Sequence, residues 1–238
     1  MLDIDPTSAA LDAVEFERQL RATGHSYYIY HPLNVLLQSG GASPHQVRGW
    51  VANRFYYEFN LPLRDAAILA NCPERDVRRE WVRRLLDRDG YGADPGGLDA
   101  WVRLGQAVGL PPAELWSMQQ VLPSVRVKVD SYIDFARIQP WQETVCASLT
   151  ELFAPSVHRE RLAQWPTHYP WIESAGLEYF RSRISLQQID PEYALRITLG
   201  HFRTREAQTR ALEVLRFKTD LLWSILEAVH LHFGKETG

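Results

Sequence analysis

Residues 148–183 read SLTELFAPSVHRERLAQWPTHYPWIESAGLEYFRSR and place ionisable side chains at helical spacing among apolar and aromatic neighbours. Glu151, His158 and Arg161 would share one face of a continuous helix, because they lie seven and then three residues apart. Pro155 is expected to kink or restart that helix, so the shared face is approximate. The segment therefore predicts grouped rather than scattered charges.

A turn and a second helix complete this segment. The stretch Trp165–Trp171, WPTHYPW, contains two prolines and is predicted to reverse the chain. Tyr179 and Arg183 then face the same way on the helix that follows, because they are four residues apart. Two interpretations fit these charges. They lie on the exposed faces of two amphipathic helices, as charged residues mostly do, or they face inward toward a common site.

The composition indicates a folded, globular protein. Hydrophobic residues make up 45% of the 238-residue chain, which is enough for a buried core. The net charge of −3 does not indicate the positive surface that nucleic-acid binding requires. No run approaches the roughly 18 apolar residues of a membrane span, and the acidic N-terminus does not resemble a secretory signal. Two cysteines, Cys72 and Cys146, fit a reducing compartment. We expect a cytoplasmic protein that binds neither nucleic acid nor membrane.

Helical signals follow one another along the chain, and no segment shows the sustained alternation of a strand. Ser43 and Pro44 supply a cap and a first helical position, whereas Pro62 is expected to interrupt the helix that they begin. Further helices are predicted over residues 16–22, 34–38, 64–72, 98–108, 121–137, 191–201 and 204–233, and one opens at residues 111–112. The pattern predicts one all-α domain over residues 1–238, a compact bundle of about seven main helices.

The helix predicted over residues 76–86 ends two residues before Arg88. Its apolar side is expected to carry Val77, Trp81, Val82, Leu85 and Leu86, and residues 87–97, DRDGYGADPGG, are predicted to form a loop. Arg88 follows this helix at a spacing that continues its apolar side, so it points inward if the helix reaches it. Otherwise it is a last-turn arginine favoured by the helix dipole.

Lys218 interrupts the apolar stripe of the last helix. The stripe consists of Ala211, Val214, Leu215, Lys218, Leu221, Leu222, Ile225 and Val229. A lysine on such a stripe either extends its amine to water or faces an anionic ligand inside the bundle. Arginine is the usual cation of this chain, which has only three lysines, and this scarcity favours the ligand.

Two other helices carry polar groups on their apolar sides. Arg54 and Glu58 continue a row from Val47 and Val51, with Trp50 and Tyr57 beside it, and Tyr132 follows Val125 and Val129. Tyr132 is interpreted either as a core tyrosine with a hydrogen-bonded hydroxyl or as a site residue. Arg54, Arg161, Arg183 and Lys218 are thus predicted to be inward cations. Arginine binds carboxylates in a bidentate way, and the chain has no glycine-rich phosphate loop, so a small polycarboxylate is the expected ligand.

Metal and nucleophile motifs are weak in this sequence. A di-iron bundle needs two Glu-x-x-His motifs, and the chain has one, from Glu227 to His230. It contains no Cys-x-x-Cys, HExxH or GxSxG motif, and both cysteines are interpreted as structural. If the chain does redox chemistry, we expect it to do so without a bound metal or a nucleotide cofactor.

Several long motifs resemble one family, the pyrroloquinoline-quinone (PQQ) synthases. The motifs are WVANRFYY (50–57), LRDAAILANCP (63–73), SLTELFAP (148–155), WPTHYPWI (165–172), YFRSR (179–183) and FKTDLLWS (217–224). The resemblance covers residues 27–233 and implies a haem-oxygenase-like bundle that acts as a homodimer. It also implies that dioxygen oxidises a tricyclic polycarboxylate by eight electrons in the last step of PQQ formation, with ring closure and release of hydrogen peroxide.

The resemblance assigns roles to particular residues. It implies catalytic roles around the reacting ring and the oxygen for Arg88, His158, Tyr179 and Arg183, and substrate binding for Tyr27, His31, Arg54, Tyr57, Glu58, Tyr132, Glu151, Arg161 and Lys218. Three positions depart from the family pattern. Tyr28 replaces a histidine, Glu58 replaces a glutamine, and Arg88 replaces a catalytic histidine. Arginine does not deprotonate in proteins, so Arg88 cannot be a general base.

Two other functions compete with the synthase. One is a binding protein for PQQ or an intermediate, in which Arg88 impairs turnover. The other is a thiaminase-like hydrolase of similar fold, which would need a cysteine nucleophile in the site.

Overall fold

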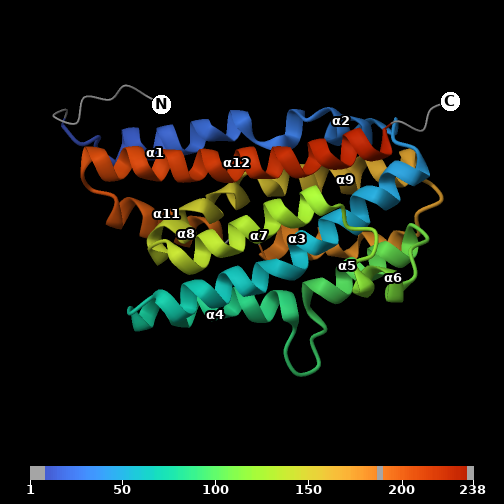
Figure 1. Ribbon diagram of the computed structural model, residues 1–238, viewed down its shortest axis with the longest axis horizontal. Coiled ribbons are helices and arrows are strands. Elements are labelled where there is room, and N and C mark those ends of the chain that lie inside the picture. Colours follow the sequence, from blue (N-terminus) through green and yellow to red (C-terminus); the bar gives the residue numbers. More distant parts are fainter. Residues whose placement is uncertain (1–8, 187–189, 235–238) are drawn as a thin grey trace.

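The computed structural model describes residues 9–186 and 190–234 (Figure 1). Within these ranges the chain folds into helices and forms no strand beyond an isolated bridge between Tyr91 and Asp94, so the prediction of an all-α fold is confirmed. There are twelve α-helices in the described ranges, more than the seven or so main helices predicted, because several are short connecting helices such as α6, of six residues. No helix in the described ranges is both long and apolar enough to span a bilayer.

The helices are joined by short turns and four 3-10 segments. The α-helices are α1 (Ala13–Ala22), α2 (Pro32–Ser39), α3 (Pro44–Asn71), α4 (Arg75–Asp89), α5 (Gly96–Ala107), α6 (Pro112–Ser117), α7 (Pro123–Ile138), α8 (Trp141–Ala147), α9 (Ala154–His168), α10 (Glu178–Leu186), α11 (Asp190–His201) and α12 (Arg205–Phe233). The 3-10 segments are η1 (Thr23–Ser26), η2 (Tyr28–Tyr30), η3 (Ser148–Leu152) and η4 (Ser174–Leu177).

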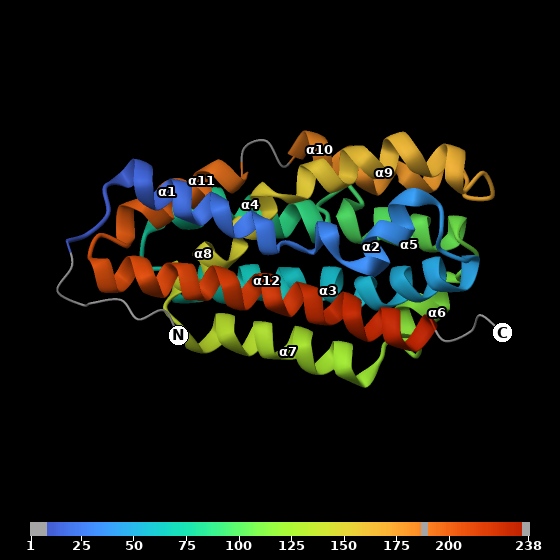
Figure 2. The ribbon, with the colours of Figure 1, turned by 90° about the horizontal axis from the view of Figure 1, so that it is seen from above.

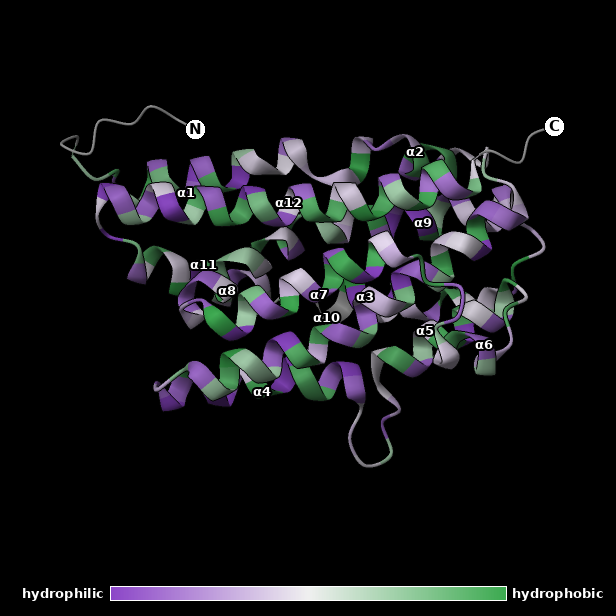
Figure 3. Ribbon diagram, viewed as in Figure 1, coloured by the Kyte–Doolittle hydropathy of each residue, from purple (hydrophilic) through white to green (hydrophobic). Residues whose placement is uncertain are grey.

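The long helices α3 and α12 organise the bundle. Helix α12 runs along the molecule, with α1 and α2 beside it and α7 on another side (Figures 1 and 2). Helix α3 packs against α4, α5, α7, α8 and α12. Most helices alternate hydrophilic and hydrophobic residues along their length (Figure 3), as expected when one side of each faces the core. Every member of the predicted α12 stripe is buried, Lys218 included.

Helix α3 begins where the sequence predicts and ends later. Ser43 accepts a hydrogen bond from the Gln46 N–H, and the Gln46 side chain accepts one from the Ser43 N–H, which completes a capping box. The predicted interruption at Pro62 is wrong, because the helix continues to Asn71. A proline inside a helix removes one backbone hydrogen bond, here to the carbonyl of Glu58, and the packing of α3 against five other helices compensates for that loss.

The quoted segment also folds differently in part. The helix restarts at Pro155 as predicted, because Ser148–Leu152 is a 3-10 turn and α9 begins at Ala154. The turn predicted at Trp165–Trp171 is shorter, since α9 extends through Pro166 to His168. Trp165 remains helical and buried, and its indole N–H donates to the Leu37 carbonyl at 2.8 Å.

The loop after α4 starts three residues later than expected. Helix α4 extends to Asp89, and the loop projects from the bundle between α4 and α5 (Figure 1). Gly90 and Gly96 close the base of this loop with φ of 84° and 74°, and a Cβ at Gly96 would lie 2.4 Å from the Gly90 nitrogen. Arg88 is therefore helical and turned inward, with 8% of its surface exposed.

Candidate active site

Eleven of the thirteen predicted site residues are joined by contacts or close charge interactions at the centre of the bundle. They are Arg54, Tyr57 and Glu58 from α3, Arg88 from α4, Tyr132 from α7, Glu151 from η3, His158 and Arg161 from α9, Tyr179 and Arg183 from α10, and Lys218 from α12. Tyr27 lies at the edge of this group, and His31 lies outside it. Residues from seven elements thus form one buried polar centre.

Glu58 is a buried carboxylate held by two arginines. It accepts hydrogen bonds from Arg54 Nε at 2.8 Å and from Arg88 Nη1 at 3.0 Å. Burial by itself raises the pKa of Glu58, but the charges of Arg54 and Arg88 outweigh burial and lower that pKa to about 2. The carboxylate is therefore ionised at neutral pH.

The buried side of α4 carries arginines where apolar residues were predicted. Val77, Trp81, Arg84 and Arg88 are buried, whereas Val82 and Leu86 are exposed, so the predicted apolar side is wrong in part. The reason is tertiary: acceptors from α3 and η3 face α4. The Trp81 indole donates to Asp65 at 2.8 Å, and Arg84 donates a short hydrogen bond to Glu151.

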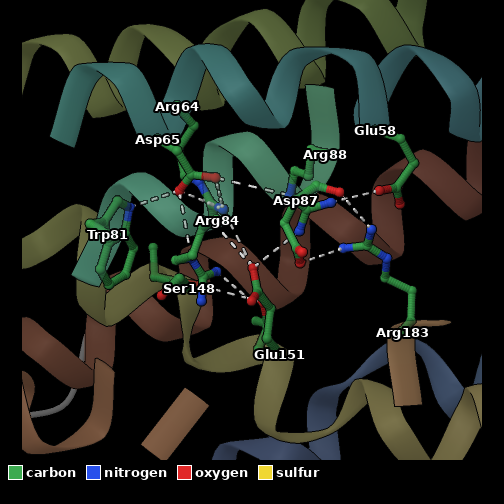
Figure 4. Close-up of polar contacts among 12 residues, drawn as sticks. Glu58, Arg64, Asp65, Trp81, Arg84, Asp87, Arg88, Ser148, Glu151 and Arg183 are labelled. Atoms are coloured by element: carbon green, nitrogen blue, oxygen red, sulfur yellow. Dashed lines mark hydrogen bonds and ion pairs between the residues drawn. The ribbon is translucent and has the colours of Figure 1, made fainter. Parts of the chain in front are cut away.

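Glu151 and Asp65 are the acceptors of a network that Figure 4 shows in close-up. Arg64 lies 3.4 Å from Glu151 and 2.9 Å from Asp65, and Arg88 lies 3.7 Å from Glu151. Burial raises the pKa of Glu151, but Arg84, Arg64 and Arg88 lower it more, well below its usual range. The predicted inward position of Glu151 is therefore that of a counter-ion shared by three arginines.

Lys218 has no carboxylate partner among the described residues. Its side chain is 1% exposed, and its amine lies 3.3 Å from the centre of the Tyr132 ring and 4.4 Å from that of Tyr57. No residue in the described ranges hydrogen-bonds to Nζ. Burial lowers the pKa of Lys218 well below its usual value, and the charges of Arg64 and Arg54 lower it further. The amine does not extend to water, which removes one of the two interpretations of the sequence.

Arg161 is likewise surrounded by aromatic rings. Its guanidinium lies 4.4 Å from the Trp50 ring and 5.4 Å from the Phe180 ring, and it donates to Asn34 Oδ1 at 2.9 Å. Its Nε has no hydrogen-bond partner among the described residues. Burial lowers the pKa of Arg161, and the charge of Arg54 contributes in the same direction. Like Lys218, it is a buried cation without an ion-pair partner in the part of the chain that the structure describes.

His158, Tyr179 and Arg183 lie together. The rings of His158 and Tyr179 are 6.1 Å apart, and the Arg183 guanidinium lies 5.4 Å from the Tyr179 ring. Burial lowers the pKa of His158 to about 3, and Arg161 contributes in the same direction, so its imidazole is neutral at pH 7. Arg183 is held near Asp87, 3.6 Å away (Figure 4). These side chains could move protons beside a bound anion.

The N-terminal residues divide between the centre and the outside. The Tyr27 ring lies 4.2 Å from that of Tyr28, and burial raises the pKa of Tyr27 well above its usual value. His31 instead caps α2: its Nδ1 accepts from the Leu33 N–H at 3.1 Å, and its Nε2 lies 3.0 Å from Glu227. Both ring nitrogens of His31 therefore contact residues outside the centre. The structure does not bring the predicted His31 to the centre.

Sequence reasoning missed Arg64, Asp65 and Arg84. All three are buried, with at most 4% of their surface exposed. The signal for Arg84 was available, because it stands three residues after Trp81 and four before Arg88, on the side that faces α3. Arg64 and Asp65 were hidden by the expected interruption at Pro62.

A metal centre and a separate cavity were considered as alternatives to this centre. No three His, Cys, Asp or Glu side chains in the described ranges lie close enough together to hold a metal ion. A cavity of about 560 Å³ lies between the start of α3, the ends of α5 and α6, and the end of α12, and none of the predicted site residues lines it. The charged centre is therefore the candidate active site.

Comparison with solved structures defines the class of fold. A domain of unknown function from Shewanella denitrificans, described as having a heme oxygenase-like fold, matches with a TM-score of 0.77 at 11% identity and covers 94% of both chains. A TenA homolog from Pseudomonas syringae matches with a TM-score of 0.71 at 13% identity and covers 96% of both chains. At such identities the likeness concerns the fold, and the predicted haem-oxygenase-like bundle is confirmed.

Sequence comparison then places the protein within that class. The chain belongs to the TENA/THI-4/PQQC family, whose model matches residues 17–228. It is 57% identical to a pyrroloquinoline-quinone synthase of Pseudomonas aeruginosa, over 96% of this chain and 91% of the relative. It is 56% identical to a protein of the same name from Pseudomonas entomophila, over 95% of this chain and 90% of that one. The family resemblance drawn from the motifs is confirmed.

Proposed function

We propose that this protein is a pyrroloquinoline-quinone synthase, which closes the last ring of a tricyclic polycarboxylate and oxidises it by eight electrons. The observation that carries the proposal is the amine of Lys218, buried without a hydrogen-bond partner among the described residues, in a chain 57% identical to a protein of that name. A lysine is rarely buried alone, because the cost of removing it from water needs a compensating partner. A bound carboxylate supplies that partner.

The charge of the whole centre supports an anionic ligand. Six arginines and Lys218 share this centre with four carboxylates. The carboxylates are those of Glu58, Asp65, Asp87 and Glu151. A planar molecule with several carboxylates offsets the remaining positive charge. Arg161 and Lys218 are the cations left for it, because no ion pair with either is found in the described ranges.

Roles in the reaction follow from chemistry and position. Arg54, Arg161 and Lys218 bind carboxylates of the substrate, and Tyr57 and Tyr132 border the Lys218 amine. His158 is neutral and can accept a proton, whereas Tyr179 keeps its proton because burial raises its pKa. Arg183 and Arg88 are permanent cations that stabilise reduced oxygen species by charge. Dioxygen is the electron acceptor in this proposal, and hydrogen peroxide is released.

Other parts of the proposal rest on the family resemblance and on the sequence. We propose that the enzyme works without a metal or organic cofactor, forms a homodimer and resides in the cytoplasm. Two competing functions find less support. Nothing in the comparisons favours a binding protein without turnover. A thiaminase-like hydrolase needs a reactive thiol, but Cys72 and Cys146 are buried, and burial raises the pKa of both.

One assay tests the proposal. The purified protein is incubated with the tricyclic precursor with and without dioxygen, and oxygen uptake, hydrogen peroxide and the quinone absorbance are followed. We expect oxygen-dependent formation of the quinone. PQQ alone is also expected to raise the melting temperature, since a ligand that binds only the folded state stabilises it. A thermal shift without oxygen uptake would indicate a binding protein, and turnover that ignores oxygen would indicate a hydrolase.

A further inference from the structure

Arg161 is held by a neutral side chain, whereas carboxylates hold the arginines of the network around Glu151. The Oδ1 of Asn34, in α2, accepts a hydrogen bond from Arg161 Nη2 at 2.9 Å. Both side chains are buried, with 1% of Asn34 and 2% of Arg161 exposed. Among the described residues, Asn34 Oδ1 is the one oxygen that accepts a hydrogen bond from this guanidinium. Arg161 is therefore held in place without a counter-ion.

The amide of Asn34 is itself held in one orientation. Its Nδ2 donates to the backbone carbonyl of Ile29, in η2, at 3.0 Å, so its oxygen is left for the guanidinium. The reverse orientation would place donor against donor and acceptor against acceptor. Asn34 is the third residue of α2, a helix that begins at Pro32 after the His31 cap. The start of α2 thus fixes the direction of the oxygen that meets Arg161.

The other neighbours of the Arg161 guanidinium are aromatic rings. They belong to Trp50, Trp165 and Phe180, at 4.4, 5.8 and 5.4 Å from the guanidinium carbon. Rings attract the positive charge, but they offer no lone pair to direct an N–H group. A guanidinium is rigid and planar, so a hydrogen bond to one nitrogen also sets the directions of the others. The hydrogen bond from Asn34 therefore orients the whole group.

We propose that Asn34 is a positioning residue of the active site, which orients Arg161 toward a substrate carboxylate and leaves its positive charge available to that carboxylate. The inference rests on the proposed function and deepens it, because it adds a residue outside the predicted set. Aspartate has nearly the same shape as asparagine, but at this position it would form a buried ion pair with Arg161 and compete with the ligand. Asparagine supplies the orientation without neutralising the charge.

Asn34→Asp tests the role of the charge. Affinity for PQQ is measured by isothermal titration of the full-length protein at pH 7, and single-turnover oxidation of the precursor is followed beside it. We expect PQQ affinity to fall by about 10- to 100-fold, as for the loss of one charge-assisted contact. The rate at saturating precursor should change much less, because Asn34 acts on binding through Arg161.

Asn34→Leu tests the role of the orientation, because leucine keeps the shape of the side chain but accepts no hydrogen bond. We expect PQQ affinity to fall by roughly 2- to 10-fold, as for the loss of one hydrogen bond. If Asn34 acts through Arg161, the same change in an Arg161→Met background should alter affinity by less than about 2-fold. A role in packing alone would give the same loss in both backgrounds.

Gln38→Met supplies the matched control. Gln38 is also a buried amide of α2, one turn after Asn34, and it donates to the Val157 carbonyl of α9 at 3.3 Å. Its loss should leave PQQ affinity at the parent value. An equal loss in Gln38→Met and Asn34→Leu would show that the packing of α2 matters and Asn34 itself does not.

Two further results would overturn the role of Asn34. One is an Asn34→Asp variant that binds PQQ as tightly as the parent, and the other is an Asn34→Leu loss of the same size with and without Arg161. A parent protein that does not bind PQQ would instead overturn the proposed function. Circular dichroism checks that each variant is folded, and Asn34→Leu with its double variant carries the test if Asn34→Asp is not.

Discussion

The buried cations of this protein fall into two groups that are surrounded differently. Arg64, Arg84 and Arg88 form the paired group, which shares the carboxylates of Asp65 and Glu151. Arg161 and Lys218 form the aromatic group, which faces rings and has no carboxylate partner in the described ranges. Both groups lose their water on folding, but among the described residues only the first regains carboxylate partners.

The difference indicates two purposes. Buried ion pairs with several hydrogen bonds offset most of their desolvation cost, and such a network fixes how α3, α4 and η3 pack. A buried cation among rings gains about 0.5–2 kcal/mol from the cation–π contact, which is less than desolvation costs. Buried cations of this kind are expected to serve a function, and binding an anionic ligand is such a function. The paired group is therefore expected to govern stability, and the aromatic group to govern binding.

Glu151→Gln should have the largest effect and should act on stability. It removes the carboxylate shared by Arg64 and Arg84 and leaves both cations with less compensation. We expect the free energy of unfolding to fall by about 3–5 kcal/mol, as when one partner of a buried pair is removed. Urea unfolding at pH 7 measures it. Glu178→Gln, in an exposed pair with Arg181, is the control and should cost less than about 1 kcal/mol. A similar small loss for Glu151→Gln would remove the distinction between the groups.

Lys218→Met should give the opposite result. Methionine fills similar space beside Tyr57 and Tyr132 without a charge to bury, so the free energy of unfolding should be unchanged or higher. Affinity for PQQ should fall by about 1.5–3 kcal/mol, roughly 10- to 100-fold, because a charge-assisted contact is lost. Isothermal titration measures the affinity, and Lys128→Met, on the exposed side of α7, is the control. Unchanged PQQ affinity would show that Lys218 does not contact the ligand.

The two groups differed in how far the sequence predicted them. Lys218 was found because it interrupts the apolar stripe of α12. The periodicity of one long helix can be recognised in the sequence without knowing which elements pack against it. The paired group was mostly missed, since which side of α4 is buried depends on acceptors that η3 and α3 supply from elsewhere in the chain. The same limit applies to Pro62, where the packing of α3 overrides a local signal, and to His31, where the residue type does not distinguish a helix cap from a ligand contact.

The contact between Glu58 and Arg88 tests whether the paired group is also energetically coupled to a predicted substrate-binding residue. The family resemblance implies that Arg88→His should raise the yield of quinone, but in this chain Arg88 is a partner of Glu58. We therefore expect Arg88→His and Glu58→Gln each to lower the free energy of unfolding, and the double variant to recover part of the loss. A double-mutant cycle in urea should give a coupling of about 0.5–3 kcal/mol. Additive losses would show that the contact is energetically unimportant.

His158 should give the smallest effect, through the pH dependence of stability. Burial lowers its pKa from 6.5 to about 3, so below pH 6.5 the unfolded chain binds a proton that the folded protein does not. The stability that His158 contributes is thus full above pH 6.5 and is lost as pH falls, by about 1.4 kcal/mol for each pH unit. Urea unfolding at pH 7.0, 6.0 and 5.0 measures this slope, and His158→Gln should lack it.

The difference between parent and variant isolates His158 from the other groups. His31 also has a lowered pKa, because of burial, but it titrates alike in both proteins and cancels from the difference. Saturating PQQ adds negative charge beside His158 and should raise its pKa, which makes the parent's stability less sensitive to acid. Equal slopes for parent and variant without ligand would mean that the folded protein protonates His158 near its usual pKa. The imidazole would then be a third cation of the aromatic group at mildly acidic pH.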